Sequence, residues 1–139
     1  MKELTIEARA DNLDKVMDFV NEDLEQLNCP INLQSLIDIA VEEIFMNIVN
    51  YAYKPEVGNV VVCISAGKEI TIRFEDTGKP YNPLDAADPD LYAPLKDRKP
   101  GGLGVYLVKK LMDKVVYMHV GNKNVFMMTK EIDEAGLRA

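Results

Sequence analysis

Three short motifs of this 139-residue chain combine residue types that could do chemistry together. The first places a carboxylate and an amide four residues apart, at Glu43 and Asn47. The second is Asp76-Thr77-Gly78, and the third is Gly101-Gly102-Leu103-Gly104. Each motif alone is weak evidence. In this order, a carboxylate, an amide and two glycine turns describe a pocket for a nucleotide with its metal ion.

Glu43 and Asn47 share one face of an expected helix, because residues four apart are neighbours on a helix surface. The side-chain oxygen of Asn47 could ligate Mg²⁺, which prefers few protein ligands and takes its other oxygens from phosphates and water. Glu43 could accept a proton from the group that attacks a γ-phosphate, or orient that group. The alternative is an ordinary solvated polar face. Glu42 ranks second, because it points about 100° away around the helix.

Asp76 directly follows an alternating segment, so its side chain is expected at the end of a strand. A fixed carboxylate can accept a hydrogen bond from the exocyclic amine of adenine, whereas guanine presents a carbonyl at the same place. Gly78 would let the backbone approach the ring closely. The alternative is an ordinary Asx turn after a strand.

The glycine run that ends at Gly104 precedes an expected helix, whose first turn offers free N–H groups and the positive end of a helix dipole. This arrangement would cradle phosphate, and the alternative is a plain junction between a loop and a helix. It is not a P-loop, because Val105-Tyr106 stands where Lys and Ser or Thr would follow. Just before the run, Arg98 could reach a γ-phosphate with its fork of donors, or be a solvated charge.

The elements around these motifs follow from hydrophobic periodicity. Alternation over residues 2–8 predicts a half-buried strand. A helix should follow, capped by Asp11 or Asn12 and broken by Pro30. A second helix, capped by Asn32, should run to about residue 53 with an apolar inward stripe consisting of Leu33, Leu36, Ile37, Ala40, Val41, Ile44 and Ile48.

Beyond the second helix the pattern changes to short strands and one long loop. Five of the seven prolines fall within residues 79–100, which excludes a regular helix or a central strand there and indicates a lid or a disordered loop. The other expected elements are two strands, a helix from Gly104, a hairpin around residues 121–124 and a frayed tail: 60–65, 70–75, 104–112, 115–120 with 125–130, and 131–139. Two hairpins imply mostly antiparallel pairing, and three amphipathic helices over one sheet face give an α/β (α+β) two-layer sandwich.

Composition limits the classes of function. The net charge of −7 argues against binding nucleic acid through a phosphate-neutralising face. Apolar content of 47% is ample for one packed domain, and no apolar run approaches the ~20 residues that a membrane span needs. The N-terminus lacks a signal-peptide core. Cys29 and Cys63 have no metal-ligand spacing, so we interpret them as reduced residues of a cytoplasmic protein.

With these residues in place, the chain resembles the GHKL ATPase superfamily over roughly residues 30–130. Glu43 to Asn47 is similar to its N box, Asp76-x-Gly78 to its adenine-binding G1 box, and Gly102-x-Gly104 to its G2 box. Within the superfamily, the stretches 41–53, 76–83 and 101–108 are most similar to the small stand-alone anti-sigma factor serine kinases of bacteria. The chain departs from them at Asn50-Tyr51, where relatives often carry Arg-His or a similar polar pair.

The resemblance implies the Bergerat ATP-binding fold, a mixed and mostly antiparallel sheet with three helices on one face. Residues 1–139 would form a single histidine-kinase-like ATPase domain, with 79–100 as the ATP lid. The implied ligands are ATP or ADP with Mg²⁺. By the same resemblance Glu43 is the base, Asn47 the Mg²⁺ ligand and Asp76 the adenine contact. The other implied nucleotide contacts are Gly78, Arg98, Gly102, Leu103 and Gly104.

The implied function is that of an ATP-binding anti-sigma regulatory protein. Such a protein phosphorylates a serine on a small anti-sigma antagonist protein and sequesters a sigma factor, without contacting nucleic acid or a membrane. Relatives often dimerise through the sheet, so a homodimer is compatible with the resemblance. The alternative from a second class is a catalytically weak, nucleotide-dependent binding switch for another regulatory protein. A nucleotide-free interaction domain is the third hypothesis.

Overall fold

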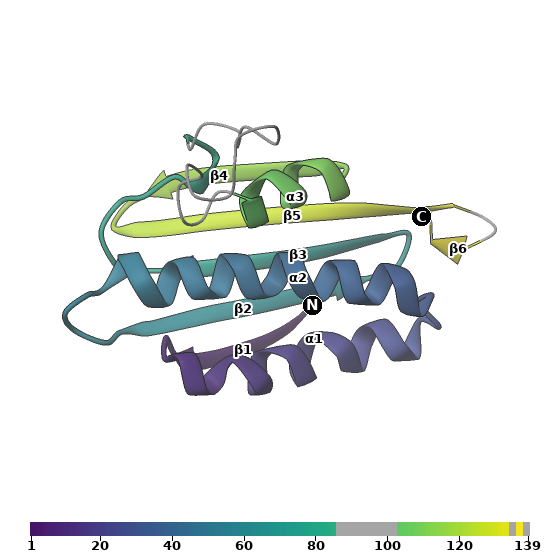
Figure 1. Cartoon of the computed structure of the whole chain (residues 1–139), viewed down its shortest axis with the longest axis horizontal. Coiled ribbons are helices and arrows are strands. Elements are labelled where there is room, and N and C mark those ends of the chain that lie inside the picture. The colour runs from purple at the N-terminus through teal and green to yellow at the C-terminus, as the bar shows by residue number, and fades with distance from the viewer. Residues whose placement is uncertain (86–102, 134–135, 138–139) are drawn as a thin grey trace, which may run out of the picture.

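The computed structural model describes residues 1–85, 103–133 and 136–137, and it has one layer of strands and one of helices (Figure 1). The strands are β1 (Lys2–Glu7), β2 (Asn59–Ala66), β3 (Glu69–Asp76), β4 (Lys114–Val120), β5 (Lys123–Asp133) and β6 (Gly136–Leu137). The helices are α1 (Leu13–Gln26), α2 (Ile31–Asn47) and α3 (Leu103–Leu111), with short helical turns at Ala10–Asn12, Ile48–Ala52 and Pro83–Asp85. The predicted two-layer sandwich is confirmed, and the three helices lie on one side of the sheet.

The sheet places Asp76 on its central strand. The strand order is β1-β2-β3-β5-β4, with β6 beside β5, and the described pairs are all antiparallel rather than mixed. The register pairs Asp76 with Val60 of β2 on one side and with Asn124 of β5 on the other. A carboxylate at the end of the central strand is thus held between two neighbouring strands.

The core forms where the helix stripes meet the inward face of the sheet. Alternation along the strands buries every second side chain, as the period of two requires. The side chains that β2 and β3 contribute to the core cluster are apolar: Val60, Val62, Ile64, Ile70, Ile72 and Phe74. They belong to one cluster with apolar residues of α1 and α2, among them Val16, Val20, Leu24, Ile37, Val41 and Ile44.

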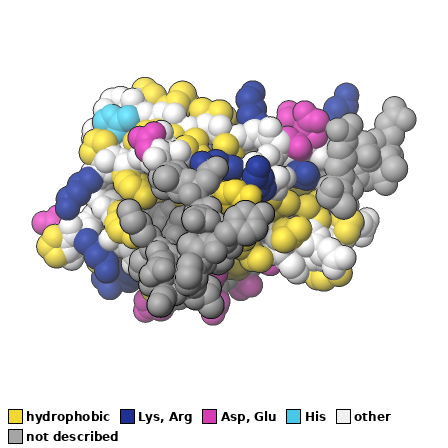
Figure 2. Space-filling view, turned by 45° about the horizontal axis from the view of Figure 1, so that its top comes forward, with side chains coloured by type: hydrophobic (Ala, Val, Ile, Leu, Met, Phe, Trp, Pro, Cys, Tyr) yellow, Lys and Arg dark blue, Asp and Glu magenta, His cyan; other side chains and the backbone are white. Residues whose placement is uncertain are grey.

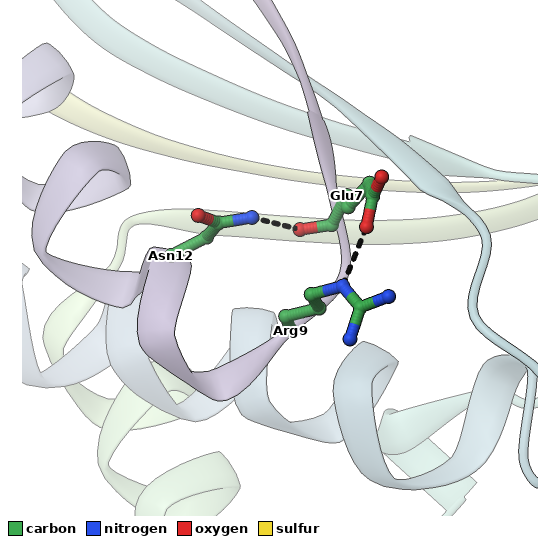
Figure 3. Close-up of polar contacts among 3 residues, drawn as sticks. All are labelled: Glu7, Arg9 and Asn12. Carbon is green, nitrogen blue, oxygen red and sulfur yellow. Dashed lines mark hydrogen bonds and ion pairs between the residues drawn. The ribbon is translucent and has the colours of Figure 1, made fainter.

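The entry into α1 differs from the predicted cap. A short 3₁₀ turn comes first, and Asn12 occupies the position before Leu13 without capping the helix through its side chain. Instead its amide Nδ2 donates to the Glu7 carbonyl at 2.9 Å, and Arg9 pairs with the Glu7 carboxylate (Figure 3). These contacts fix the corner between β1 and α1.

The junction between α1 and α2 also differs from the prediction. The first helix ends before Pro30, because Asn28 adopts the left-handed conformation (φ 58°) and Cys29 N–H donates to the Leu24 carbonyl at 3.0 Å. This is the αL termination typical of helix C-termini. Pro30 itself is the residue before α2, so the predicted Asn32 cap is wrong and Asn32 lies within the first turn.

The inward stripe of α2 is confirmed except at Leu36, which is 45% exposed. Gln34 is buried in its place, because its amide donates to the Asn21 side chain of α1 at 3.0 Å. The helix continues as a π-helical turn over Ile48–Ala52, which agrees with the predicted end near Tyr53.

The C-terminal hairpin is longer and its turn is tighter than predicted. The turn consists of Gly121, with a φ of 63°, and Asn122, so Asn124 lies within β5. The predicted frayed tail is wrong where β5 continues through Asp133 and β6 pairs with it. The longer strand extends the pairing of β5 with β3 as far as Glu69.

Cys29 and Cys63 are both free, as the prediction of reduced cysteines requires. Burial raises the pKa of the Cys63 thiol, which hydrogen-bonds with Arg73. Of the helices in the described part of the chain, none is both long and apolar enough to span a bilayer.

Candidate functional site

A pocket opens where α2 ends beside the end of β3. Its walls are mostly apolar, and a few polar side chains point into it. The lining residues come from α2 and its π-helical turn, from the sheet, and from the segment after β3: Ile44, Asn47, Ile48, Ala52; Phe74, Asp76, Tyr117, Asn124, Phe126; and Lys79, Tyr81, Pro83. Apolar walls with a small number of convergent polar groups are typical of a small-molecule site.

Asp76 is 7% exposed and its carboxylate is held by two hydrogen bonds to one oxygen. Gly78 N–H and the Asn124 amide Nδ2 both donate to Oδ1, each at 2.9 Å. The Gly78 bond is the Asx turn that the sequence offered as an alternative. The alternative of an Asx turn is therefore present, and the carboxylate that this turn fixes lines the pocket.

The loop after β3 is joined to the end of α2 at close range. A Cβ at Gly78 would overlap the Ala52 carbonyl, so only glycine allows this approach. Lys79 N–H donates to that carbonyl at 2.7 Å. The Tyr53 hydroxyl accepts from Thr77 N–H at 2.8 Å and donates to the carbonyl of Asn59 at 2.6 Å. These contacts join the second motif to the π-helical turn that follows the first motif.

The third motif meets the first at Glu43. Gly104, in the first turn of α3, lies so close to the Glu43 side chain that an added Cβ would overlap its carboxylate. Asn47 lies one helical turn after Glu43, lowers the pKa of its carboxyl, and lines the pocket together with Asp76. The structure therefore brings Glu43, Asn47, Asp76 and Gly104 to one region of the molecule.

The electrostatic environment of Glu43 suits a proton acceptor. Burial raises the pKa of its carboxyl first, and the neighbouring charge of Glu42 raises it further, against a lowering effect of the hydrogen bond with Asn47. A carboxyl whose pKa is moved toward neutral is a better general base than an exposed one. Glu42 itself is exposed, in line with its second rank.

Tyr81 lines the pocket, and its ring contacts that of Tyr51. The rings of Tyr51 and Tyr81 are 5.3 Å apart between centroids, with 52% and 42% of each residue exposed. Burial, Tyr51 and Glu43 together raise the pKa of the Tyr81 hydroxyl, which places Tyr81 within electrostatic reach of Glu43. Tyr51 belongs to the pair at which the sequence departs from the resembled kinases.

The acidic total charge does not make this side of the molecule uniformly negative. Figure 2 shows Lys and Arg side chains interspersed with hydrophobic ones on this face. The two lysines of α3, Lys109 and Lys110, lie in its last turn. Local basic charge of this kind is compatible with an anionic ligand on a protein of net charge −7.

Some of the predicted site lies outside the described residues. Arg98 and Gly102 fall there, with most of the predicted lid over 79–100. Leu103 is the first residue of α3.

Sequence reasoning missed Asn124 and Tyr117. Asn124 was assigned to a turn, where Asn is common, yet it is 6% exposed and paired in register with Asp76. The signal that could have found it is an Asn one residue into a strand, where asparagine is depleted.

Comparison with known proteins identifies the family of this chain. A family model described as the histidine kinase-like ATPase domain matches residues 6–130. The chain therefore belongs to the family of histidine kinase-like ATPase domains, which the GHKL resemblance predicted.

Curated relatives narrow the family further. The chain is 30% identical over 121 residues to the serine-protein kinase RsbW of Bacillus mycoides (strain KBAB4), covering 84% of this chain and 69% of that one. With RsbW of Bacillus cereus (strain Q1) the identity is 31% with the same coverage. These relatives confirm the resemblance to the anti-sigma kinase subgroup.

A solved structure supports the fold independently. The crystal structure of the RsbU and RsbW domains of Rv1364c from Mycobacterium tuberculosis superposes with a TM-score of 0.60 at 16% identity. The match covers 93% of this chain but 32% of that longer one. At this identity the likeness shows the fold alone.

Proposed function

We propose that this chain is an ATP-dependent protein serine/threonine kinase of the anti-sigma type. It binds ATP with Mg²⁺, phosphorylates a serine on a small anti-sigma antagonist protein and sequesters a sigma factor. The observation that carries the proposal is the position of Glu43, which lies against Gly104 and one helical turn before Asn47, a residue that lines the pocket of Asp76. The RsbW relatives support the kinase assignment.

The end of the pocket at Asp76 fits the adenine ring. Asp76 keeps one carboxylate oxygen in two hydrogen bonds, and within the described residues the other oxygen, Oδ2, has no partner. That oxygen would accept from the exocyclic amine of adenine, whereas the carbonyl of guanine would be repelled. Gly78 packs against the Ala52 carbonyl, which fixes the turn that holds Asp76 beside the apolar walls.

The other end fits phosphate and a magnesium ion with few protein ligands. Among the described residues no group of three or more His, Cys, Asp or Glu is placed to hold a metal. Asn47 would supply one amide oxygen, with phosphate and water as the remaining ligands, and bound Mg²⁺ would neutralise phosphate charge. Residues at the start of α3, Leu103 and Gly104, would offer backbone N–H groups, and Gly102 and Arg98 are proposed as further contacts.

Phosphoryl transfer would then use Glu43 as the base. The serine hydroxyl of the antagonist gives its proton to the Glu43 carboxylate while its oxygen bonds to the γ-phosphorus. The bond from the γ-phosphorus to the β–γ bridging oxygen breaks, and the products are phosphoserine and ADP. Ionised Glu43 is required, so the raised pKa sets the acidic limit of the reaction.

The proposal treats residues 1–139 as a single ATPase domain, with 79–100 as its lid, in the cytoplasm. Sequestration of a sigma factor and competition by the unphosphorylated antagonist are proposed from the subgroup. No direct contact with nucleic acid or membrane is included, and a homodimer through the sheet is compatible with it. The alternative, a catalytically weak nucleotide-dependent switch, would use the same pocket without the transfer step.

The test has two stages, of which the first needs no partner. Calorimetric titration of ADP and ATP with Mg²⁺ measures binding, and binding with a micromolar Kd is expected. Incubation with γ-labelled ATP and a candidate antagonist protein then measures transfer to serine, with Glu43→Ala as the variant that binds nucleotide and does not transfer it.

The possible results separate the hypotheses. Transfer by the wild type that is lost in Glu43→Ala supports the kinase. Binding without transfer, even to an antagonist that an RsbW relative phosphorylates, favours the switch. Absence of nucleotide binding refutes both and leaves a partner-binding domain.

A further inference from the structure

We propose that Asn124 is a positioning residue for base recognition, with Tyr117 as the residue that holds it. Asn124 would fix the Asp76 carboxylate so that one oxygen stays turned toward the base. This inference deepens the proposed function and rests on the assignment of the pocket to adenine.

The contacts of Asn124 are unusually complete for one side chain. Its amide Nδ2 donates to Asp76 Oδ1 at 2.9 Å, to the Lys79 carbonyl at 3.0 Å and to the Gly78 carbonyl at 3.3 Å. Its Oδ1 accepts a hydrogen bond from the Tyr117 hydroxyl. Asn124 is 6% exposed, and its bond to Asp76 is buried while the other three are partly buried.

The two oxygens of the Asp76 carboxylate have different roles. Oδ1 accepts from Gly78 N–H and from Asn124, one bond from the loop and one from the neighbouring strand. A carboxylate held through one oxygen by donors from two directions cannot rotate freely about its last bond. Oδ2 is thereby directed to the pocket that Asp76 and Asn124 both line.

Tyr117 gives the Asn124 amide its orientation. A reversed amide would turn its oxygen toward the Asp76 carboxylate and two carbonyls, which all lack a proton to donate. The Tyr117 hydroxyl satisfies the amide oxygen in the orientation that places Nδ2 toward Asp76. Without this hydroxyl the buried acceptor would be left unpaired, which disfavours this orientation of the amide.

Asn124 also joins the base-reading carboxylate to the segment that follows. The two carbonyls that accept from its amide belong to Gly78 and Lys79, the residues that lead from β3 toward the predicted lid. A single amide therefore holds the carboxylate and the start of that segment in one arrangement.

The decisive variant is Asn124→Asp, which keeps the shape and replaces the donor by a second carboxyl. Two carboxylates this close cannot both ionise easily, so the pair retains one proton at acidic pH. The shared proton restores a donor to Asp76, and adenine recognition should survive. As pH rises the second carboxyl ionises, the donor disappears, and nucleotide affinity should fall more than tenfold.

The titratable groups around Asp76 and position 124 are the same in the variant and in the wild type. Lys79, Tyr81 and Tyr117 are the other titratable side chains that line the pocket. His119 is the register partner of Asn124 on β4. Asn122→Asp is the matched control, because it adds the same charge two residues away, at an exposed turn position.

The experiment is calorimetric titration of Mg²⁺ and ADP into the three proteins between about pH 5.5 and about pH 8. The quantity compared is the Kd of each variant divided by the wild-type Kd at the same pH, which cancels the ionisation of ADP. We expect a ratio near one at all pH values for Asn122→Asp, and a ratio that rises above ten with pH for Asn124→Asp. A flat ratio near one for Asn124→Asp overturns the inference, and a flat raised ratio shows a merely structural role and also overturns it.

A second variant keeps the test decisive if circular dichroism shows Asn124→Asp to be unfolded. Tyr117→Phe should weaken ADP binding about threefold to tenfold with an unchanged far-UV spectrum. Tyr106→Phe on α3, outside the pocket lining, should leave the Kd unchanged. Equal Kd values for Tyr117→Phe and the wild type overturn the role of Tyr117. Failure of the wild type itself to bind ADP overturns the proposed function, which is a distinct result.

Discussion

The two edges of α2 carry nearly the same electrostatic arrangement with different surroundings. On the edge toward α1, Asp38 accepts a hydrogen bond from the Asn21 amide at 3.3 Å. On the edge toward α3, the Asn47 amide lowers the pKa of the Glu43 carboxyl. Burial is the largest cause that raises each carboxyl pKa, and a second carboxylate adds to it, Glu25 for Asp38 and Glu42 for Glu43.

The difference lies in what each carboxylate faces. Oδ1 of Asp38 is buried without a hydrogen-bond partner among the described residues, in the seam between two packed helices. Glu43 lies against a glycine at the start of α3 and beside a pocket. A raised pKa by itself therefore does not identify a base. The neighbouring pocket distinguishes Glu43, as a candidate base, from Asp38, whose carboxylate lies between two packed helices. The predictions below compare these two edges and the site beside Glu43.

The largest expected effect is on phosphoryl transfer. Glu43→Gln keeps the size and the polarity of the side chain but cannot accept a proton, so the transfer rate should fall at least about 100-fold. Asp38→Asn, the equivalent change on the other edge, should leave the rate within about twofold. Initial rates at saturating ATP measure both. Equal losses in the two variants would break the comparison.

The next effect is on nucleotide affinity. In Asp76→Asn the side-chain oxygen must stay with its two donors, which turns an N–H group toward the adenine amine. The affinity for ADP should therefore fall at least about tenfold, while the far-UV circular dichroism stays unchanged. Calorimetry measures the ADP affinity of Asp76→Asn, with Asp38→Asn as the control. An unchanged ADP affinity in Asp76→Asn would refute the assignment of the pocket to adenine.

Gly104→Ala should have an intermediate effect. Its methyl group would overlap the Glu43 carboxylate and displace it, so the transfer rate should fall roughly tenfold or more. Gly67→Ala is the matched control, because an added Cβ there meets nothing within 4 Å. The contact between the first and third motifs would be unimportant for transfer if both alanine variants behaved alike.

A smaller effect is expected on stability at Asp38. Because its pKa is raised on folding, the wild type gains stability as pH falls and loses it as pH rises through the raised pKa. Asp38→Asn removes this loss, so its free energy of unfolding at neutral pH should exceed that of the wild type by roughly 1 kcal/mol or less. The gain should vanish below the unfolded-state pKa. Urea unfolding at several pH values measures it, and a gain that persists in acid would contradict the explanation.

The smallest effect is a shift in pH dependence. Glu42→Gln removes the like charge that helps to raise the pKa of Glu43, so the acidic limb of the transfer rate should move to lower pH. Glu25→Gln lowers the pKa of Asp38 in the same way and should leave the profile in place. A pH–rate profile of each variant is the measurement, and a shift with Glu25→Gln would argue against Glu43 as the base.

Local periodicity was enough to predict the layers and most of the core. Alternation found β1 and β3, and the apolar stripe found α2 to within a turn of its end. It failed at Leu36 and Gln34, because which side of a stripe is covered depends on where α1 and α3 pack. That information lies in tertiary contacts and not in helical spacing.

The site shows the same limit. Glu43, Asn47, Asp76 and Gly104 could be named because each belongs to a short local motif. Asn124 has no such motif: its partner Asp76 is 48 residues away, and only the register of β3 with β5 brings them together. Local sequence patterns cannot identify residues whose role depends on strand pairing.

The Tyr53 hydroxyl has a consequence for the fidelity of strand pairing. It links Thr77 to Asn59, at the open end of the hairpin formed by β2 and β3. A slip of that hairpin by one residue would turn every β3 side chain to the opposite face, and Asp76 with them. Such a slip would have to break both bonds of the hydroxyl. The Tyr53 hydroxyl therefore stabilises the strand register on which adenine recognition by Asp76 depends.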